Sequence, residues 1–131
     1  MDRQYTDQVI VLNAAAADGA SVSVNMRSFK AVLLQIAQVG FTGTIKLVGS
    51  NADAAPDFSV AASASNPYDT VTAQDLNDQS TIDGDTGIVS VTQTSVRQLE
   101  LNSDGLKWIG VVISNRSAGS VTVKASGYSG N

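Results

Sequence analysis

Residues 30–49 read KAVLLQIAQVGFTGTIKLVG, and this stretch decides the fold class of the chain. A helix would gather apolar residues in one stripe, which the spacing of Val32, Leu33 and Ile36 would allow. A strand would place every second residue on one face, and Val32, Leu34 and Ile36 also fit that period. The stretch is therefore ambiguous when its first half is taken alone.

The second half of the stretch favours strands. Gly40 ends the first apolar run. In residues 41–49, Ile45 and Leu47 occupy one face of a strand with a period of two, and the residues at 44, 46 and 48 occupy the other. Such a β-type run directly after a glycine fits a strand that follows another strand. We therefore predict strands at residues 30–39 and 41–49.

Short runs of the same kind recur about every ten residues along the rest of the chain. The clearest is residues 20–26, where Val22, Val24 and Met26 alternate with polar residues. The other predicted strands are residues 8–12, 58–64, 68–76, 88–92, 96–102, 108–115 and 120–128. Turn-forming residues separate them, as at 103–105 and 117–119, which resemble hairpin connections.

These runs predict an all-β fold, a single antiparallel β-sandwich or jelly-roll-like domain of about nine or ten short strands. We place this domain at residues 9–131. Residues 1–8 are polar and lack a strong local pattern. We predict that they form a flexible N-terminal arm that becomes ordered on a partner or on a neighbouring protomer.

Composition narrows the classes of partner. The chain has 131 residues, of which 43% are hydrophobic and 15% charged, with a net charge of −4. Its eight basic residues are scattered, whereas nucleic-acid binding needs them clustered, so we expect no nucleic-acid partner. No segment approaches the roughly 20 apolar residues of a membrane span, and no export signal is visible. We therefore expect no membrane partner and synthesis in the host cytoplasm.

The residue types used most often in catalysis are scarce. The chain has no Cys and no His, and its single Glu is Glu100. It therefore has no thiolate, no imidazole base and no Ser-His-Asp triad. We predict that the protein is not an enzyme and has no catalytic residues, no cofactor and no metal site.

Three acidic patterns are nevertheless candidates for chemistry. Residues 85–87 spell the Asp-Thr-Gly of aspartic proteases, but turn formers precede Asp85 where apolar residues are expected, so we interpret the triplet as a turn. A Ca²⁺ site is an alternative for the acidic segment, although its spacing does not match a known calcium loop. Glu100 lies between two leucines and is predicted to face solvent from a strand. The acidic segment comprises Asp75, Asn77, Asp78, Asp83 and Asp85.

Aromatic residues leave a binding function open. β-Sandwiches can bind sugars on exposed rings, but only 5% of this chain is aromatic. Trp108 begins an apolar run and is expected to pack in the core. Tyr5, Tyr68 and Tyr128 lie near strand ends, where a ring can pack while its hydroxyl stays in water.

Several phrases of the sequence together resemble small virion proteins of tailed bacteriophages. They are DxVxxLNAA (7–15), APDFS (55–59), IDGDTGI (82–88), GLKWI (105–109) and RSAGSVTV (116–123). The resemblance spans nearly the whole chain and implies a β-sandwich that decorates or cements the capsid. It also implies a trimer between major capsid subunits, and it transfers no catalytic residue.

The residues and the resemblance together lead to one expected function. We expect a non-enzymatic structural protein of a tailed-phage particle, a capsid decoration or cement protein that stabilises the head. It would act as a homotrimer on the capsid surface of the virion, with the major capsid protein as its partner. The alternative is a receptor- or carbohydrate-binding β-sandwich of a head fibre or tail component.

Overall fold

The computed structural model describes residues 8–27, 29–102 and 106–128, with the backbone alone at Asn102 and Tyr128. Every regular element in this part of the chain is a β-strand. The strands are β1 (Val9–Ala15), β2 (Gly19–Ala20), β3 (Val24–Asn25), β4 (Ala31–Ser50), β5 (Asp69–Thr70), β6 (Ala73–Asp75), β7 (Thr81–Ile82), β8 (Ile88–Asn102) and β9 (Trp108–Tyr128).

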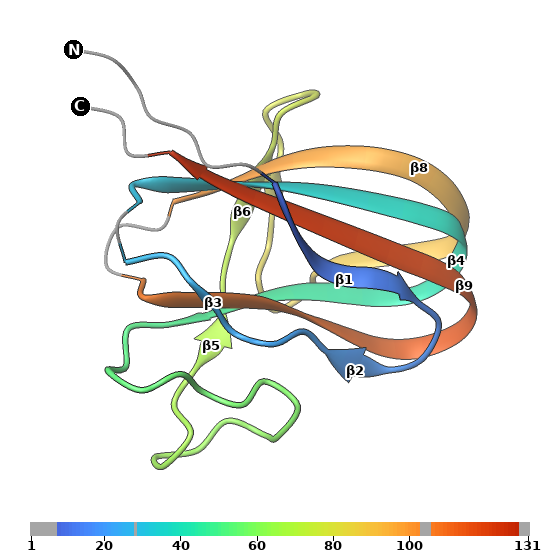
Figure 1. Ribbon diagram of the computed structural model, residues 1–131. Helices are drawn as coiled ribbons and strands as arrows, with labels where there is room; N and C mark the ends of the chain where they lie inside the picture. The colour runs from blue at the N-terminus through green and yellow to red at the C-terminus, as the bar shows by residue number, and fades with distance from the viewer. Residues whose placement is uncertain (1–7, 28, 103–105, 129–131) are drawn as a thin grey trace.

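Three of these strands are long enough to belong to both layers of the fold. β4 has 20 residues, β8 has 15 and β9 has 21, and all pairings between them are antiparallel. Figure 1 shows the three running together through one layer, bending at the same end of the molecule and returning through the other. One hydrogen-bonded sheet therefore folds over itself into a sandwich.

The register assigns each half-strand to a layer. In the first layer, residues 31–39 of β4 lie between the second halves of β8 and β9. β1 extends this layer beyond β9, and β6 and β7 extend it beyond β8, which gives the order β1-β9-β4-β8-β6-β7. In the second layer, the later part of β4 pairs with the first halves of β8 and β9, while β2, β3 and β5 add short edges.

We call the bend the corner, formed by residues 39–44, 91–94 and 114–120. The register shifts there in both long pairings, and Gly40, Thr92, Asn115 and Gly119 have positive φ angles of 46–77°. Threonine hydroxyls accept backbone N–H groups at the shifts. Thr94 Oγ1 accepts from Gly40 N at 2.9 Å, and Thr42 Oγ1 accepts from Thr92 N at 2.8 Å. The side chains thus supply bonds at the positions where the ladder is interrupted.

The core fills the space between the two layers. Val32, Leu34 and Ile36 of the first layer face inward, as do Ile45 and Leu47 of the second. The other buried apolar residues of this cluster are Val11, Met26, Phe41, Ala73, Ile88, Leu99, Leu101, Ile109, Val111, Ile113, Val121, Val123 and Ala125. The alternation of apolar residues along each strand is the direct cause of this core.

The predicted fold class is confirmed, because the described chain is an all-β antiparallel structure. The lengths of the strands differ from the prediction. Gly40 bends a continuous β4 instead of ending it, and residues 88–92 and 96–102 likewise form one strand, β8. Residues 108–115 and 120–128 form one strand, β9, so the predicted hairpin connection at 117–119 is wrong and lies within a strand. The predicted strand at 58–64 is also wrong, because this polar, Ala- and Ser-rich segment belongs to a loop, and the predicted strands at 20–26 and 68–76 are each replaced by two short strands. The predicted N-terminal arm, except Gln8, and the predicted connection at 103–105 lie outside the described residues.

The corner yields a prediction about stability. A Cβ added to Gly119 would lie 2.3 Å from the backbone of Gly40, whereas a Cβ on Gly40 meets nothing within 4 Å. Both glycines have positive φ, so Ala at either position incurs a left-handed backbone cost of about 1–2 kcal/mol. We expect Gly119→Ala to lower the free energy of unfolding by clearly more than the Gly40→Ala control in urea titrations. Equal losses for the two variants would contradict this account of the corner.

Candidate interaction surfaces

The Asp-Thr-Gly triplet lies in the turn between β7 and β8. The Asp83 carboxylate accepts the backbone N–H groups of Asp85 at 2.8 Å and Thr86 at 3.2 Å. Gly87 has a φ of 69°, and a Cβ there would lie 2.6 Å from the Ile45 carbonyl oxygen. Asp85 is exposed and accepts a hydrogen bond from the Thr70 hydroxyl at 2.8 Å. The triplet therefore forms a tight turn against β4, as the sequence interpretation predicted.

The remaining residues of the acidic segment bond to their own turn. Asp75 accepts the N–H of Asn77 at 2.9 Å and lies 3.8 Å from the Arg97 guanidinium. Asp78 accepts the N–H of Ser80, and hydrogen bonds from Ser80 lower the pKa of the Asp78 carboxyl. Within residues 8–27, 29–102 and 106–128, no three potential metal ligands gather at one point. The structure thus separates the carboxylates that the sequence places close together.

Glu100 lies on β8, on the face opposite to Leu99 and Leu101. Both leucines are buried, whereas Glu100 is half-buried and pairs across the sheet with Leu33 and Gln74. The strand therefore turns this carboxylate away from the core, as its flanking leucines predict.

The aromatic side chains that the structure describes are engaged in packing. Phe41 is fully buried, and Phe58 packs edge-on against Tyr68 with ring centroids 5.0 Å apart. Tyr68 donates its hydroxyl to the Val60 carbonyl at 2.7 Å. Trp108 is half-buried at the start of β9, and is not in the central core. Tyr5 and the side chain of Tyr128 lie outside the described part of the chain.

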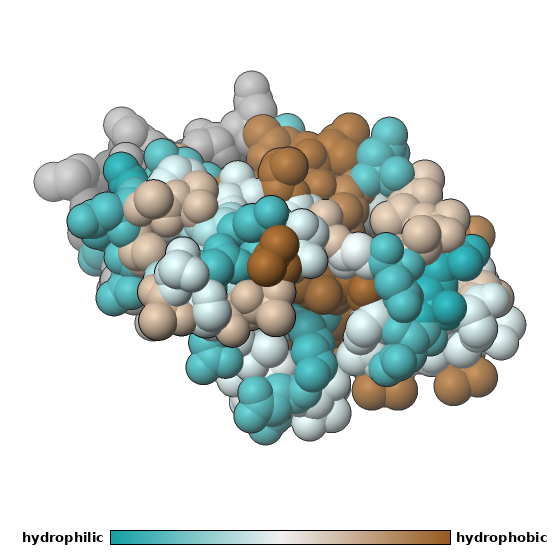
Figure 2. Space-filling view, turned by 90° about the horizontal axis from the view of Figure 1, so that it is seen from below, coloured by the Kyte–Doolittle hydropathy of each residue, from teal (hydrophilic) through white to brown (hydrophobic). Residues whose placement is uncertain are grey.

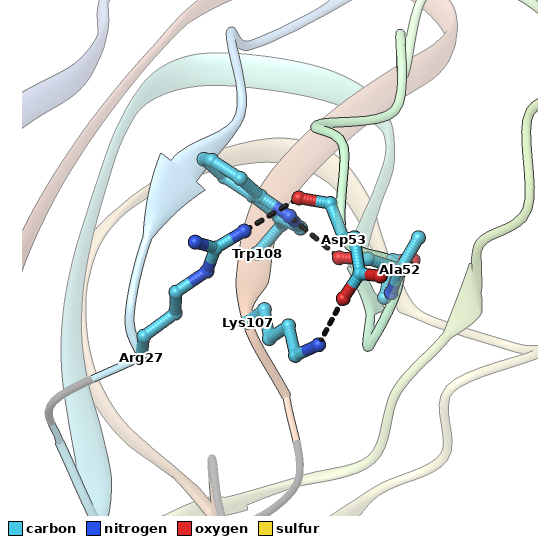
Figure 3. Close-up of polar contacts among 6 residues, drawn as sticks. Arg27, Ala52, Asp53, Lys107 and Trp108 are labelled. Carbon is cyan, nitrogen blue, oxygen red and sulfur yellow. Dashed lines mark hydrogen bonds and ion pairs between the residues drawn. The ribbon is translucent and has the colours of Figure 1, made fainter.

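Trp108 anchors a polar cluster at the end of the sandwich away from the corner (Figure 3). Its indole N–H donates to the Ala52 carbonyl at 3.0 Å, and the Arg27 guanidinium lies 4.9 Å from the ring centroid, a cation–π distance. Arg27 also donates to the Asp53 carbonyl at 2.5 Å. Lys107 forms an ion pair with the Asp53 carboxylate at 2.6 Å. The cluster ties the loop after β4 to the residue pair that follows β3 and to the start of β9.

The same cluster shifts the titration of Asp53. Hydrogen bonding and charge attraction from Lys107 lower the pKa of the Asp53 carboxyl, with a smaller contribution from Arg27. The ionised form of Asp53 is therefore favoured in the folded protein.

A notch of about 580 Å³ lies beside β8, between the corner and the turn that follows β6. Its lining residues carry charges of both signs and several amides and are Asp75, Leu76, Asn77, Asp78, Gln93, Ser95, Val96, Arg97 and Gln98. β6 pairs with β8 only at Leu99 and Glu100, and one further bond joins Leu76 N to the Gln98 carbonyl. The notch therefore begins at the point where β6 leaves the sheet.

Two polar side chains beside the notch have no hydrogen-bond partner among the described residues. They are Gln38, which is only 2% exposed, and Ser95, its register partner on β8. A buried polar group without a partner typically destabilises a fold by about 1–3 kcal/mol. Local sequence does not reveal this pair, although Gln38 stands where the alternation of Val32, Leu34 and Ile36 predicts an apolar residue.

Exposed valines surround the corner. We call Val39, Val89, Val91 and Val96 the corner valines, and each has more than 60% of its surface exposed. They lie on β4 and β8, within a few residues of the bend. Figure 2 shows that the face seen from below carries its apolar side chains in separate patches divided by polar ones. Rigid strands therefore present small apolar contacts near the corner.

Comparison with known proteins finds the same fold in solved structures but no matching sequence. No protein-family model and no curated protein sequence matches the chain. Two solved structures have the same fold at 13% sequence identity. The first is the SPBc2 prophage-derived protein YomS, with a TM-score of 0.71 over 98% of this chain and 96% of that one. The second is the PBSX exported protein XepA, with a TM-score of 0.70 over 98% of this chain.

The two matches differ in how much of the neighbour they cover. This chain spans 39% of the length of XepA, whereas it spans nearly all of YomS. The fold therefore occurs both as nearly a whole chain and as one part of a longer chain. No described helix is long and apolar enough to cross a membrane.

The contacts of the Trp108 cluster predict a change in the fluorescence of Trp108 at acid pH. Because the pKa of Asp53 is lowered in the folded protein, its ion pair stabilises the fold above the ordinary Asp value of 3.8. That stabilisation is lost as the pH falls through the lower pKa of the folded state. We expect the emission of Trp108, the only tryptophan, to change below pH 3.8 and to lose that step in Asp53→Asn. Asp57→Asn, in the same loop, is the matched control, and a titration unchanged in Asp53→Asn would refute the assignment.

Proposed function

We propose that the chain is a non-enzymatic structural protein of a phage particle, specifically a capsid decoration or cement protein. In this proposal a homotrimer on the capsid surface bridges neighbouring major capsid subunits and so stabilises the head. The two structural neighbours support a phage context, since both are prophage-derived proteins with this fold.

The single observation that carries the proposal is the set of corner valines. A cement protein needs a stiff body with apolar contacts at its surface, and it needs no reactive group. The corner valines are held on long paired strands, so little conformational entropy is lost when a partner covers them. The carboxylates of the acidic segment are engaged in turns, which leaves binding as the function that the described surface supports best.

A hollow near Tyr68 favours the alternative, a receptor- or carbohydrate-binding module. About 460 Å³ in volume, it is lined by Tyr68 together with polar side chains such as Asn51 and Asp69. An aromatic ring beside a few polar groups is typical of small-molecule sites, and sugars are one such class of ligand. Glycan-array binding that disappears in Tyr68→Ala would establish this alternative, and an array without signal would count against it.

The capsid proposal is tested with two matched variants. Val91 is 76% exposed at the corner, and Val22 is 77% exposed elsewhere on the molecule. We expect Val91→Lys to weaken co-sedimentation with undecorated capsids of the same phage at least tenfold, because it places a charge in the apolar contact. Val22→Lys should bind as the unmodified chain does. Failure of the unmodified chain to bind capsids would refute the proposal, and equal binding by both variants would refute the role of the corner.

A further inference from the structure

One side of β8 carries backbone groups that no described residue pairs. The Leu76 N–H bonds to the Gln98 carbonyl, so the backbone of Gln98 points away from β4. Because backbone groups alternate along an antiparallel strand, the N–H and C=O of Val96 point the same way. Among the described residues, β6 does not extend as far as Val96, so this edge of the sheet opens into the notch.

The side chains at this edge indicate which kind of strand would pair with it. On the inward face, Ser95 and Gln38 are buried polar groups without a described partner, and Ser95 lies between Gln38 and the edge. On the outward face, Val96 is 61% exposed. A strand that paired here would supply partners to Ser95 and Gln38 if its inward side chains could form hydrogen bonds. Its outward side chains would cover Val96 if they were aromatic or aliphatic.

The chain itself contains a segment with this pattern. Residues 1–8 read MDRQYTDQ, so an extended conformation would place Gln4, Thr6 and Gln8 on one face. Arg3 and Tyr5 would lie on the other face. The amide and hydroxyl face matches Ser95 and Gln38, and the tyrosine matches the exposed Val96.

Geometry determines which copy of the chain supplies the segment. β1, which the segment precedes, lies at the opposite edge of the first layer, three strand spacings from β8. Three spacings amount to about 14 Å, while seven extended residues reach at most about 24 Å. A segment that crossed its own sheet would keep about three residues for pairing. A segment from a neighbouring copy would keep all seven.

We propose that residues 1–7 of one copy add as a strand to the edge of β8 in the next copy. This inference deepens, and rests on, the homo-oligomer in the proposed function. The contact joins two different surfaces, so repeating it from copy to copy forms a closed ring when the rotation allows it. Backbone hydrogen bonds at Val96 supply the pairing, and the inward side chains set its register.

The first test compares the mass of three full-length proteins by light scattering over a dilution series. Val96→Pro removes the edge N–H without removing a bond to β4, and Val96→Thr keeps that N–H as the matched control. We expect the unmodified chain and Val96→Thr to form the same oligomer. Val96→Pro should dissociate at a concentration at least tenfold higher. An excess of a synthetic peptide of residues 1–8 should dissociate the unmodified oligomer, and a scrambled peptide should not.

The second test holds even if Val96→Pro fails to fold. Because the chain has no cysteine, any disulfide must join two introduced cysteines and so reports which positions lie close together. Thr6→Cys combined with Gln93→Cys should give disulfide-linked oligomers on mild oxidation. Thr6→Cys combined with Ser59→Cys, in an exposed loop far along the chain, should not.

Three outcomes would overturn the inference. They are a monomeric unmodified chain, equal dissociation of Val96→Pro and Val96→Thr, and equal cross-linking of the two cysteine pairs. Capsid co-sedimentation gives an independent result. Loss of capsid binding with an intact, peptide-sensitive oligomer would refute the capsid role alone, whereas capsid binding by a monomer would refute the strand exchange and the homotrimer but not the capsid role.

Discussion

The structure depends on one constraint, which is that three hydrogen-bonded strands must bend at the same level. β4 pairs with β8 on one side and with β9 on the other, so a bend in one strand has to be matched in its neighbours. Gly40, Thr92 and Gly119 provide the positive φ angles, and threonine hydroxyls replace the interrupted ladder bonds. The bend makes one sheet into two facing layers, and the core exists because of it.

The corner also determines what the surface offers to a partner. Strands that turn sharply leave their outward valines exposed around the bend, and β8 passes beyond the end of β6 just before it. An open edge and a set of apolar side chains therefore lie near one another on a rigid part of the fold. At the opposite end, contacts of Arg27, Lys107 and Trp108 tie the loop after β4 to the rest of the sandwich.

Part of the site chemistry was predictable from local sequence. The interpretation of Asp85 and its neighbours as a turn needed only the glycines and the Asp83 cap, which act within a few residues. The contacts of Trp108 could not be predicted from local sequence, because its partners Arg27 and Ala52 are distant in sequence. Gln38 was visible as a polar residue in an apolar alternation. That its partner in the sheet is Ser95, beside an open edge, depends on the pairing of β4 with β8.

The sequence by itself determined the all-β class, because alternation with a period of two allows a core only between pleated sheets. It also determined the turn at residues 83–87, since Asp and Gly stabilise that conformation locally. The tertiary structure alone decided that Gly40 bends a strand instead of ending it. A glycine permits either outcome, and the choice depends on whether the neighbouring strands, 50 to 80 residues away, bend with it. The same distant pairings created the notch, the open edge of β8 and the surroundings of Trp108.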